Sequence, residues 1–218
     1  MGTGYRASGG RLLATLTRVT NEERAQRALV RVHQAHSALL SDLDEPVNPA
    51  RPSELPGWSL GHLLTHLARN ADSVTRRLAA AGRGEHAHQY EGGLDGRVAE
   101  IDAGARRSWA ELRDDVEESC RLLESTAAGL APEAWGVEST TVTGLVLPAA
   151  TVLERRVREV VIHHTDLGLS FTPAAWPDDL VDELNDELVA SLRSRADAHA
   201  LAGWLTGRAP APFVAPWS

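Results

Sequence analysis

The chain has 218 residues, a net charge of −8, and hydrophobic and charged fractions of 43% and 24%. These values are typical of a soluble globular protein, and the acidic balance argues against a nucleic-acid-binding surface, which needs a basic patch. No apolar run approaches the roughly 20 residues of a membrane span, and the N-terminus lacks the apolar core of a secretory signal. We therefore expect a cytoplasmic protein without nucleic-acid or membrane partners, monomeric or homodimeric.

The first third of the chain predicts two long helices joined by a proline-rich linker. Residues 1–19 show no helical pattern and are expected to form a flexible N-terminus. Thr20-Asn-Glu-Glu23 fits a capping box, so the first helix begins there and runs to about residue 44. Prolines interrupt the following linker, and Ser59 is the expected N-cap of a second helix that ends near residue 81.

The remaining elements are predicted from periodicity and from proline and glycine. A loop rich in Gly and His over residues 82–95 precedes a third helix over 96–129, where the lone cysteine, Cys120, falls in the apolar stripe and is expected in the core. The β-prone stretch 135–147 allows a short hairpin. Pro148 fits the first turn of a fourth long helix over 148–169, closed by Gly168.

Four long helices with linkers of unequal length predict an all-α fold, a four-helix bundle over residues 20–170 with at least one crossover. Residues 171–218 read as a short helical C-terminal extension, with a helix near 178–196 and a shorter one near 200–207. Recurrent prolines exclude a helix from the final ten residues.

The fourth helix carries the clearest candidate for chemistry. Glu159 and His163 are four residues apart, so they lie one turn apart on the same helix face and are able to hold one divalent metal together. Glu159 also lies in an apolar run, where an unpaired carboxylate would be costly. Its partner is therefore either a metal or one of the neighbouring arginines, Arg155, Arg156 and Arg158.

A second helix offers a third ligand, because His62 and His66 form an HxxxH pair. His62 falls in the first helical turn, where capping or exposure is expected, whereas His66 lies deeper among leucines, which favours it as the ligand. Three protein ligands with an open position are typical of a catalytic zinc site. The other histidines are expected to be solvated or to face elsewhere: His33, His36, His86, His88, His164 and His199.

Two long motifs resemble the mycothiol-dependent maleylpyruvate isomerase family of DinB-like metal-binding four-helix bundles. The first is LPGWSLGHLLTHLARNAD, residues 55–72, and the second is REVVIHHTDLG, residues 158–168. They occur in the order and spacing of the family, and the resemblance covers roughly residues 20–170.

The resemblance implies that zinc is bound by His66, Glu159 and His163, in agreement with the choice made from periodicity. It also implies mycothiol as a cofactor, with the metal-bound thiolate adding reversibly to the cis double bond of maleylpyruvate so that rotation gives the trans product. Arg97 and Arg208 match functional arginines of the family and would bind the substrate carboxylates.

Two further residues are expected near the site on position alone. Asp166 lies three residues after His163 and is able to orient it as a hydrogen-bond acceptor. Asn70 lies four residues after His66 and would face the same cavity. We assign both to the cofactor-binding surroundings.

The chain departs from the family pattern at the C-terminus. The family usually has a small α/β domain between the Glu/His helix and the last helix, whereas only about 45 residues separate His163 from Arg208 here, and they read as helical. The position of Arg208 and the native substrate are therefore open. Alternatives to the isomerase are a mycothiol S-transferase, a non-catalytic metal-binding bundle, and a metal-free bundle with a Glu159–Arg ion pair.

Overall fold

The computed structural model describes residues 19–90 and 92–214, so nearly all of the N-terminus expected to be flexible, 1–19, lies outside the described residues. Within the described part, 66% is helical, in seven α-helices and two short 3₁₀ helices (Pro132–Gly136 and Pro173–Ala175), with one small antiparallel hairpin. None of these helices is both long and apolar enough to cross a membrane. The elements are α1 (Asn21–Asp42), α2 (Leu60–Gly82), α3 (Gly93–Gly104), α4 (Trp109–Ala128), β1 (Glu138–Thr140), β2 (Val146–Pro148), α5 (Ala149–Asp166), α6 (Asp178–Arg195) and α7 (Ala198–Leu205).

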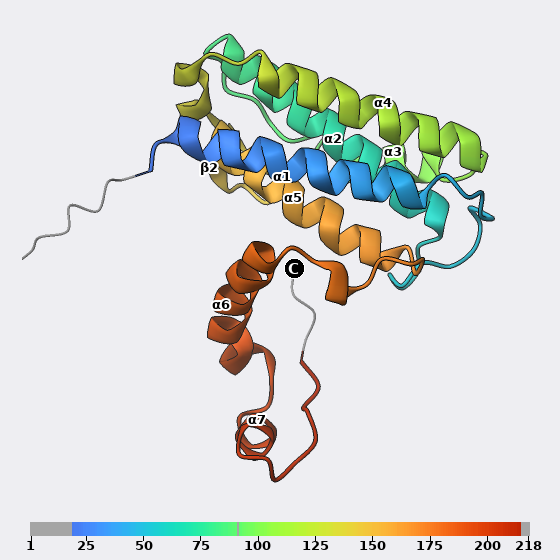
Figure 1. Ribbon diagram of the computed structural model, residues 1–218, viewed down its shortest axis with the longest axis vertical. Coiled ribbons are helices and arrows are strands. Elements are labelled where there is room, and N and C mark those ends of the chain that lie inside the picture. Colours follow the sequence, from blue (N-terminus) through green and yellow to red (C-terminus); the bar gives the residue numbers. More distant parts are fainter. Residues whose placement is uncertain (1–18, 91, 215–218) are drawn as a thin grey trace, which may run out of the picture.

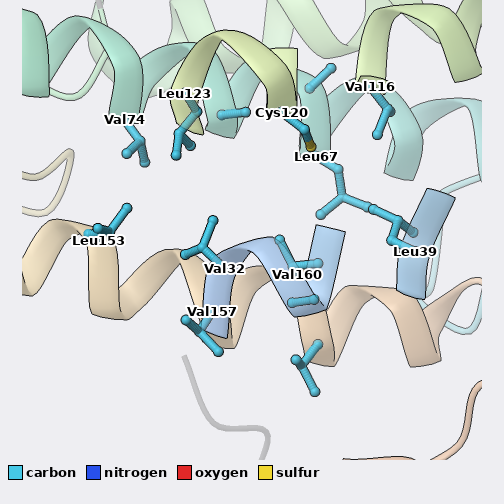
Figure 2. Close-up of a cluster of buried hydrophobic side chains, with 14 of the residues drawn as sticks. Val32, Leu39, Leu67, Val74, Val116, Cys120, Leu123, Leu153, Val157 and Val160 are labelled. Atoms are coloured by element: carbon cyan, nitrogen blue, oxygen red, sulfur yellow. The ribbon is translucent and has the colours of Figure 1, made fainter. Parts of the chain in front are cut away.

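The four long helices α1, α2, α4 and α5 form a bundle, which confirms the all-α fold class (Figure 1). Helix α1 packs on α5 and α4, while α2 packs on α4, α5 and α3. Aliphatic side chains from all four helices meet in the centre, with Val32 from α1, Leu67 from α2, Cys120 from α4 and Val157 from α5 (Figure 2). Cys120 is buried, as expected.

Side-chain caps fix where the helices begin. The predicted capping box at Thr20 is present, with its hydroxyl accepting from the Glu23 amide. Ser59 is also an N-cap as predicted, but its reciprocal partner is the ring of His62, whose Nδ1 accepts from the Ser59 amide at 3.2 Å. This contact gives His62 the capping role that its first-turn position favoured.

The prediction of one helix over residues 96–129 is wrong, because the chain forms two helices separated by a break at residues 105–108. Helix α4 begins at a capping box in which Ser108 pairs with Glu111. The preceding end of α3 lies so close to α2 that a Cβ on Gly61 would overlap the carbonyl oxygen of Ala105. The break thus lets a short helix fold back on α2 beside the candidate site.

The hairpin and the start of the last bundle helix agree with prediction. Strands β1 and β2 pair antiparallel, with Ser139 opposite Leu147, and β2 runs directly into α5. Helix α5 ends at Asp166, and Gly168 follows with a φ of +61°, the left-handed conformation that favours glycine at a helix C-terminus.

The C-terminal region docks on the bundle through α6. Leu180 and Leu184 are buried against the bundle core. Acidic residues of α6 pair with Arg31 of α1, which contacts Asp179 and Glu183, and with Arg158 of α5, whose Nη1 lies 2.5 Å from Glu187. In the described residues 171–214 there is no strand beyond one isolated bridge between Ala196 and Val214, as the helical pattern predicted.

A buried polar cluster lies in the middle of the bundle. The Arg156 side chain, 1% exposed, donates to His36 Nε2, to the Leu67 carbonyl and to Asn70 Oδ1. On its other side His36 contacts Glu124 through Nδ1 at 2.7 Å. The expectation that His36 is solvated is therefore wrong. The helical periodicity of α1 allows a buried side chain at position 36. A histidine is accommodated there because Glu124 and Arg156, from two other helices, supply its hydrogen-bond partners.

This cluster predicts an acid-sensitive contribution to stability. Burial lowers the pKa of His36 to about 4, and the Arg156 charge adds to this although the Glu124 hydrogen bond opposes it. As pH falls from about 6.5 to about 4, the unfolded state takes up a proton that the folded state refuses, so up to about 3 kcal/mol of unfolding free energy is lost. Urea unfolding across this range should show a shallower pH slope for His36→Gln. The matched control is His33→Gln, since the exposed His33 contacts the same carboxylate, and parallel curves for His36→Gln and wild type would contradict the assignment.

Candidate metal centre

The three ligands selected from the sequence converge between α2 and α5. His66 Nε2 lies 3.2 Å from Glu159 Oε2, and His163 Nε2 lies 3.6 Å from the same oxygen. One possible ligand atom from each of the three residues lies within 4.8 Å of the other two. Two imidazoles and one carboxylate at this spacing are the donor set that zinc takes in catalytic sites with an open fourth position.

The electrostatics of the three side chains suit a divalent cation. Burial is the largest influence on both buried groups: it lowers the pKa of His66, and it acts to raise the pKa of Glu159. For Glu159, however, the His66 hydrogen bond and the neighbouring positive groups outweigh burial and hold the pKa at about 2. The carboxylate of Glu159 is therefore ionised, and burial favours the neutral form of the His66 imidazole; these are the protonation states required of metal ligands.

The same geometry bears on the metal-free alternative. Among the described residues, the ion-pair contacts of Glu159 are with His66 and His163, and none is with an arginine. The side chain of Arg156 instead points to the buried cluster, and Arg158 pairs with α6. The structure therefore does not contain the Glu159–Arg pair that was considered from the sequence.

Asp166 fixes the orientation of the His163 ring through the nitrogen that faces away from Glu159. Its Oδ2 lies 2.8 Å from His163 Nδ1, which leaves Nε2 directed at Glu159. A carboxylate acceptor on the far ring nitrogen fixes the tautomer that leaves Nε2 free for a metal. The backbone of Asp166 is itself fixed, because its carbonyl accepts from the Glu54 amide in the linker before α2.

His66 is enclosed more tightly. The Trp58 ring meets it edge-on at 5.4 Å between centroids, and Arg97 Nη2 lies 3.2 Å from its Nδ1. Arg97 also lies over the face of Trp58. A metal-bound imidazole carries its proton on Nδ1, and a guanidinium has no acceptor to offer it. Metal binding at Nε2 therefore requires Arg97 to turn away from His66.

A cavity of about 430 Å³ opens above the three ligands. Side chains at successive turns of α2 form one wall, and residues from the loop before α3, from α3 itself, from the hairpin and from α5 form the rest. Its lining residues are His66, Asn70, Val74, Arg77, Gln89, Tyr90, Leu94, Arg97, Thr141, Val142, Thr143, Val152, Arg155, Glu159 and His163.

The family model for the mycothiol maleylpyruvate isomerase N-terminal domain matches residues 29–168. The chain belongs to this family. Two solved structures are similar to it: the mycothiol-dependent maleylpyruvate isomerase and a histidine-to-alanine mutant of that protein. Each is 28% identical, with a TM-score of 0.71, over 78% of this chain and 71% of the other. None of the curated proteins compared with the chain matches it.

The structure brings most, but not all, of the residues selected from the sequence to one place. Arg97 and Asn70 line the cavity with the three ligands, although the Asn70 carboxamide oxygen is already occupied by Arg156. Asp166 lies behind His163. Arg208, in contrast, is exposed at the end of α7, donates to the Thr206 carbonyl and is absent from the cavity lining. The roles assigned to these four residues stay predictions.

Sequence reasoning missed several cavity residues that carry polar groups, among them Arg77 and Tyr90. The signal for Arg77 was present, because it lies eleven residues after His66 and eleven residues return a helix to nearly the same face. Tyr90 belongs to a loop, where no periodicity indicates direction.

The first test separates the two histidines of α2. His66→Ala should reduce bound zinc from about one ion per chain to a small fraction of that, because two remaining ligands hold zinc weakly. His62→Ala is the matched control on the same helix, and it should keep its zinc while losing a little thermal stability with the cap. Elemental analysis of dialysed protein gives the zinc content. Loss of zinc in His62→Ala with retention in His66→Ala would identify the other histidine as the ligand.

A second test concerns the support of His163. Replacing Asp166 by Asn keeps the size of the side chain but removes the anionic acceptor, so zinc affinity should fall about 10- to 100-fold. Competition with a chromogenic chelator measures the affinity. The exposed Asp114 on α4 provides a control, and Asp114→Asn should bind zinc as the wild type does. Unchanged affinity in Asp166→Asn would show that the contact does not tune the ligand.

Proposed function

We propose that the protein is a metal- and mycothiol-dependent enzyme that isomerises an activated cis double bond in a small carboxylic acid of the maleylpyruvate type. The observation that carries this proposal is the convergence of His66, Glu159 and His163 at the base of a cavity, within the part of the chain that matches the family. The similar solved protein is itself a mycothiol-dependent maleylpyruvate isomerase.

The residues of the chain would divide the work as follows. His66, Glu159 and His163 would hold a divalent ion such as zinc, and Asp166 would keep the imidazole of His163 aligned. The bound ion would supply Lewis acidity, which lowers the pKa of a thiol so that thiolate is present at neutral pH. Trp58 and the leucines around His66 would exclude water from one side of the site.

Arg97 is suited to bind the substrate. It lies at the cavity wall beside His66, and a metal held at His66 Nε2 would require it to turn from the ring, which would leave its guanidinium available for an anionic substrate. A guanidinium fork binds a carboxylate through two parallel hydrogen bonds, which fixes its orientation as well as its position. Metal binding at His66 would therefore release Arg97 for contact with the substrate.

A mycothiol S-transferase is the second candidate, and the C-terminal region favours it. Helix α6 docks on α1 and α5, and Arg208 is exposed outside the cavity. A site that lacks this second family arginine would hold a dicarboxylate less firmly and would accept other electrophiles. In that case the thiol would remain attached to the product.

Whether mycothiol is regenerated or consumed distinguishes these functions. The zinc-loaded protein should convert maleylpyruvate to fumarylpyruvate with the mycothiol concentration unchanged, because an isomerase regenerates the thiol. A transferase would consume one thiol per product, giving a mass-spectrometric adduct. Chelation of the metal, or Glu159→Gln, should lower the rate at least about 100-fold. Zinc binding without turnover of any electrophile would leave only a metal-binding bundle, and turnover without thiol would contradict the proposal.

A further inference from the structure

The end of the cavity remote from the three ligands contains polar groups without partners. Arg77 is 5% exposed, and its Nη2 is buried with no hydrogen-bond partner among the described residues. Tyr90 is 6% exposed, and its hydroxyl is likewise buried and without a partner there. Both residues line the cavity. Buried polar groups in native proteins are nearly always satisfied, so two such groups at one end of a cavity indicate a missing ligand.

The chemistry of the missing ligand follows from charge. Among the described residues, Arg77 has one hydrogen-bond partner, the neutral hydroxyl of Ser139 at 2.9 Å from its Nε. Arg155 also lines the cavity, and Glu159, at the opposite end, is the one carboxylate among the lining residues that the structure describes. A buried guanidinium that lacks an anionic partner is strongly destabilising. The partner that would neutralise it is a ligand oxyanion, which would also accept a hydrogen bond from the Tyr90 hydroxyl.

Position along α2 separates this end from the metal ligands. Arg77 follows His66 by eleven residues, which is three helical turns on nearly the same face and a rise of about 16 Å. Asn70 and Val74 lie between them on the same wall. The cavity is therefore polar at both ends, with metal ligands at one and a cationic donor pair at the other.

We propose that Arg77 and Tyr90 form an oxyanion-binding subsite for a carboxylate or phosphate group at the end of the substrate remote from its reacting carbon. This proposal deepens the proposed function, because it defines the substrate as an anion anchored at both ends of the cavity. In this chain Arg77 supplies the second cation of the site in place of the exposed Arg208.

Oxyanion binding by the full-length protein, free of metal and loaded with zinc, tests the subsite. Hexanoate and inorganic phosphate are the probes, and the uncharged hexanamide controls for chain length. NMR titration follows the Arg Nε–H signals and the backbone amides of the Tyr90 loop. We expect saturable binding of one or both anions, no binding of hexanamide, and affinity at least about tenfold lower in Arg77→Met. The tighter anion identifies the group as carboxylate or phosphate.

Two further variants keep the result interpretable. Arg121→Met removes the same charge from the exposed face of α4, where Arg121 pairs with Glu118, and should bind as the wild type does. Tyr90→Phe removes one hydroxyl with little change in packing, so it reports on the subsite even where Arg77→Met unfolds, and it should weaken anion binding several-fold.

The outcomes separate this proposal from the proposed function. Absence of anion binding, or equal binding in wild type, Arg77→Met and Tyr90→Phe, overturns the subsite whatever the zinc content. Anion binding that depends on Arg77 in a protein unable to retain zinc supports the subsite while rejecting the metal enzyme. With zinc loaded, substrate analogues that lack the remote oxyanion should show a raised KM.

Discussion

The arrangement of the bundle depends on the hydrogen bonds that the buried guanidinium of Arg156 donates. From α5 it reaches His36 on α1, the Leu67 carbonyl and Asn70 on α2, and Cys120 on α4. Apolar packing alone tolerates small sliding of one helix along another, whereas these directional bonds do not. Arg156 precedes Glu159 by about one turn, and Leu67 and Asn70 follow His66 by one and four residues. The register that brings Glu159 to His66 is therefore fixed by the same side chain that ties the helices together.

The sequence predicted what depends on neighbours along the chain. The pairing of Glu159 with His163, the caps at Thr20 and Ser59, and the choice of His66 all follow from spacing within a single helix. The sequence also marks the break before α4, because Ser108 and Glu111 have the spacing of a capping box. The prediction of one helix over residues 96–129 did not use this signal. Burial of His36 and the direction of Arg156 could not be predicted, since each depends on partners more than 80 residues away.

The C-terminal helices act on the bundle from outside. Two leucines of α6, Leu180 and Leu184, join the core cluster of the bundle, while its acidic residues pair with Arg31 and Arg158. These ion pairs are partly exposed and contribute little energy singly, so the buried Leu180 and Leu184 supply most of the attachment. Arg158 thus pairs with α6, whereas Glu159 pairs with His66 and His163.

Charge is distributed unevenly between the core and the cavity. Arg156 is buried and bonded to four acceptors, so its desolvation is compensated. Arg77 is almost as buried, yet within the described part of the chain its one hydrogen-bond partner is the Ser139 hydroxyl. A protein selected for stability alone would replace such a residue by an apolar one, since an uncompensated charge in the interior is destabilising. Its presence on the cavity wall, three turns from His66, is explained when a ligand supplies the compensating charge. Compensation of the buried Arg77 charge would then contribute favourably to the binding free energy of an anion.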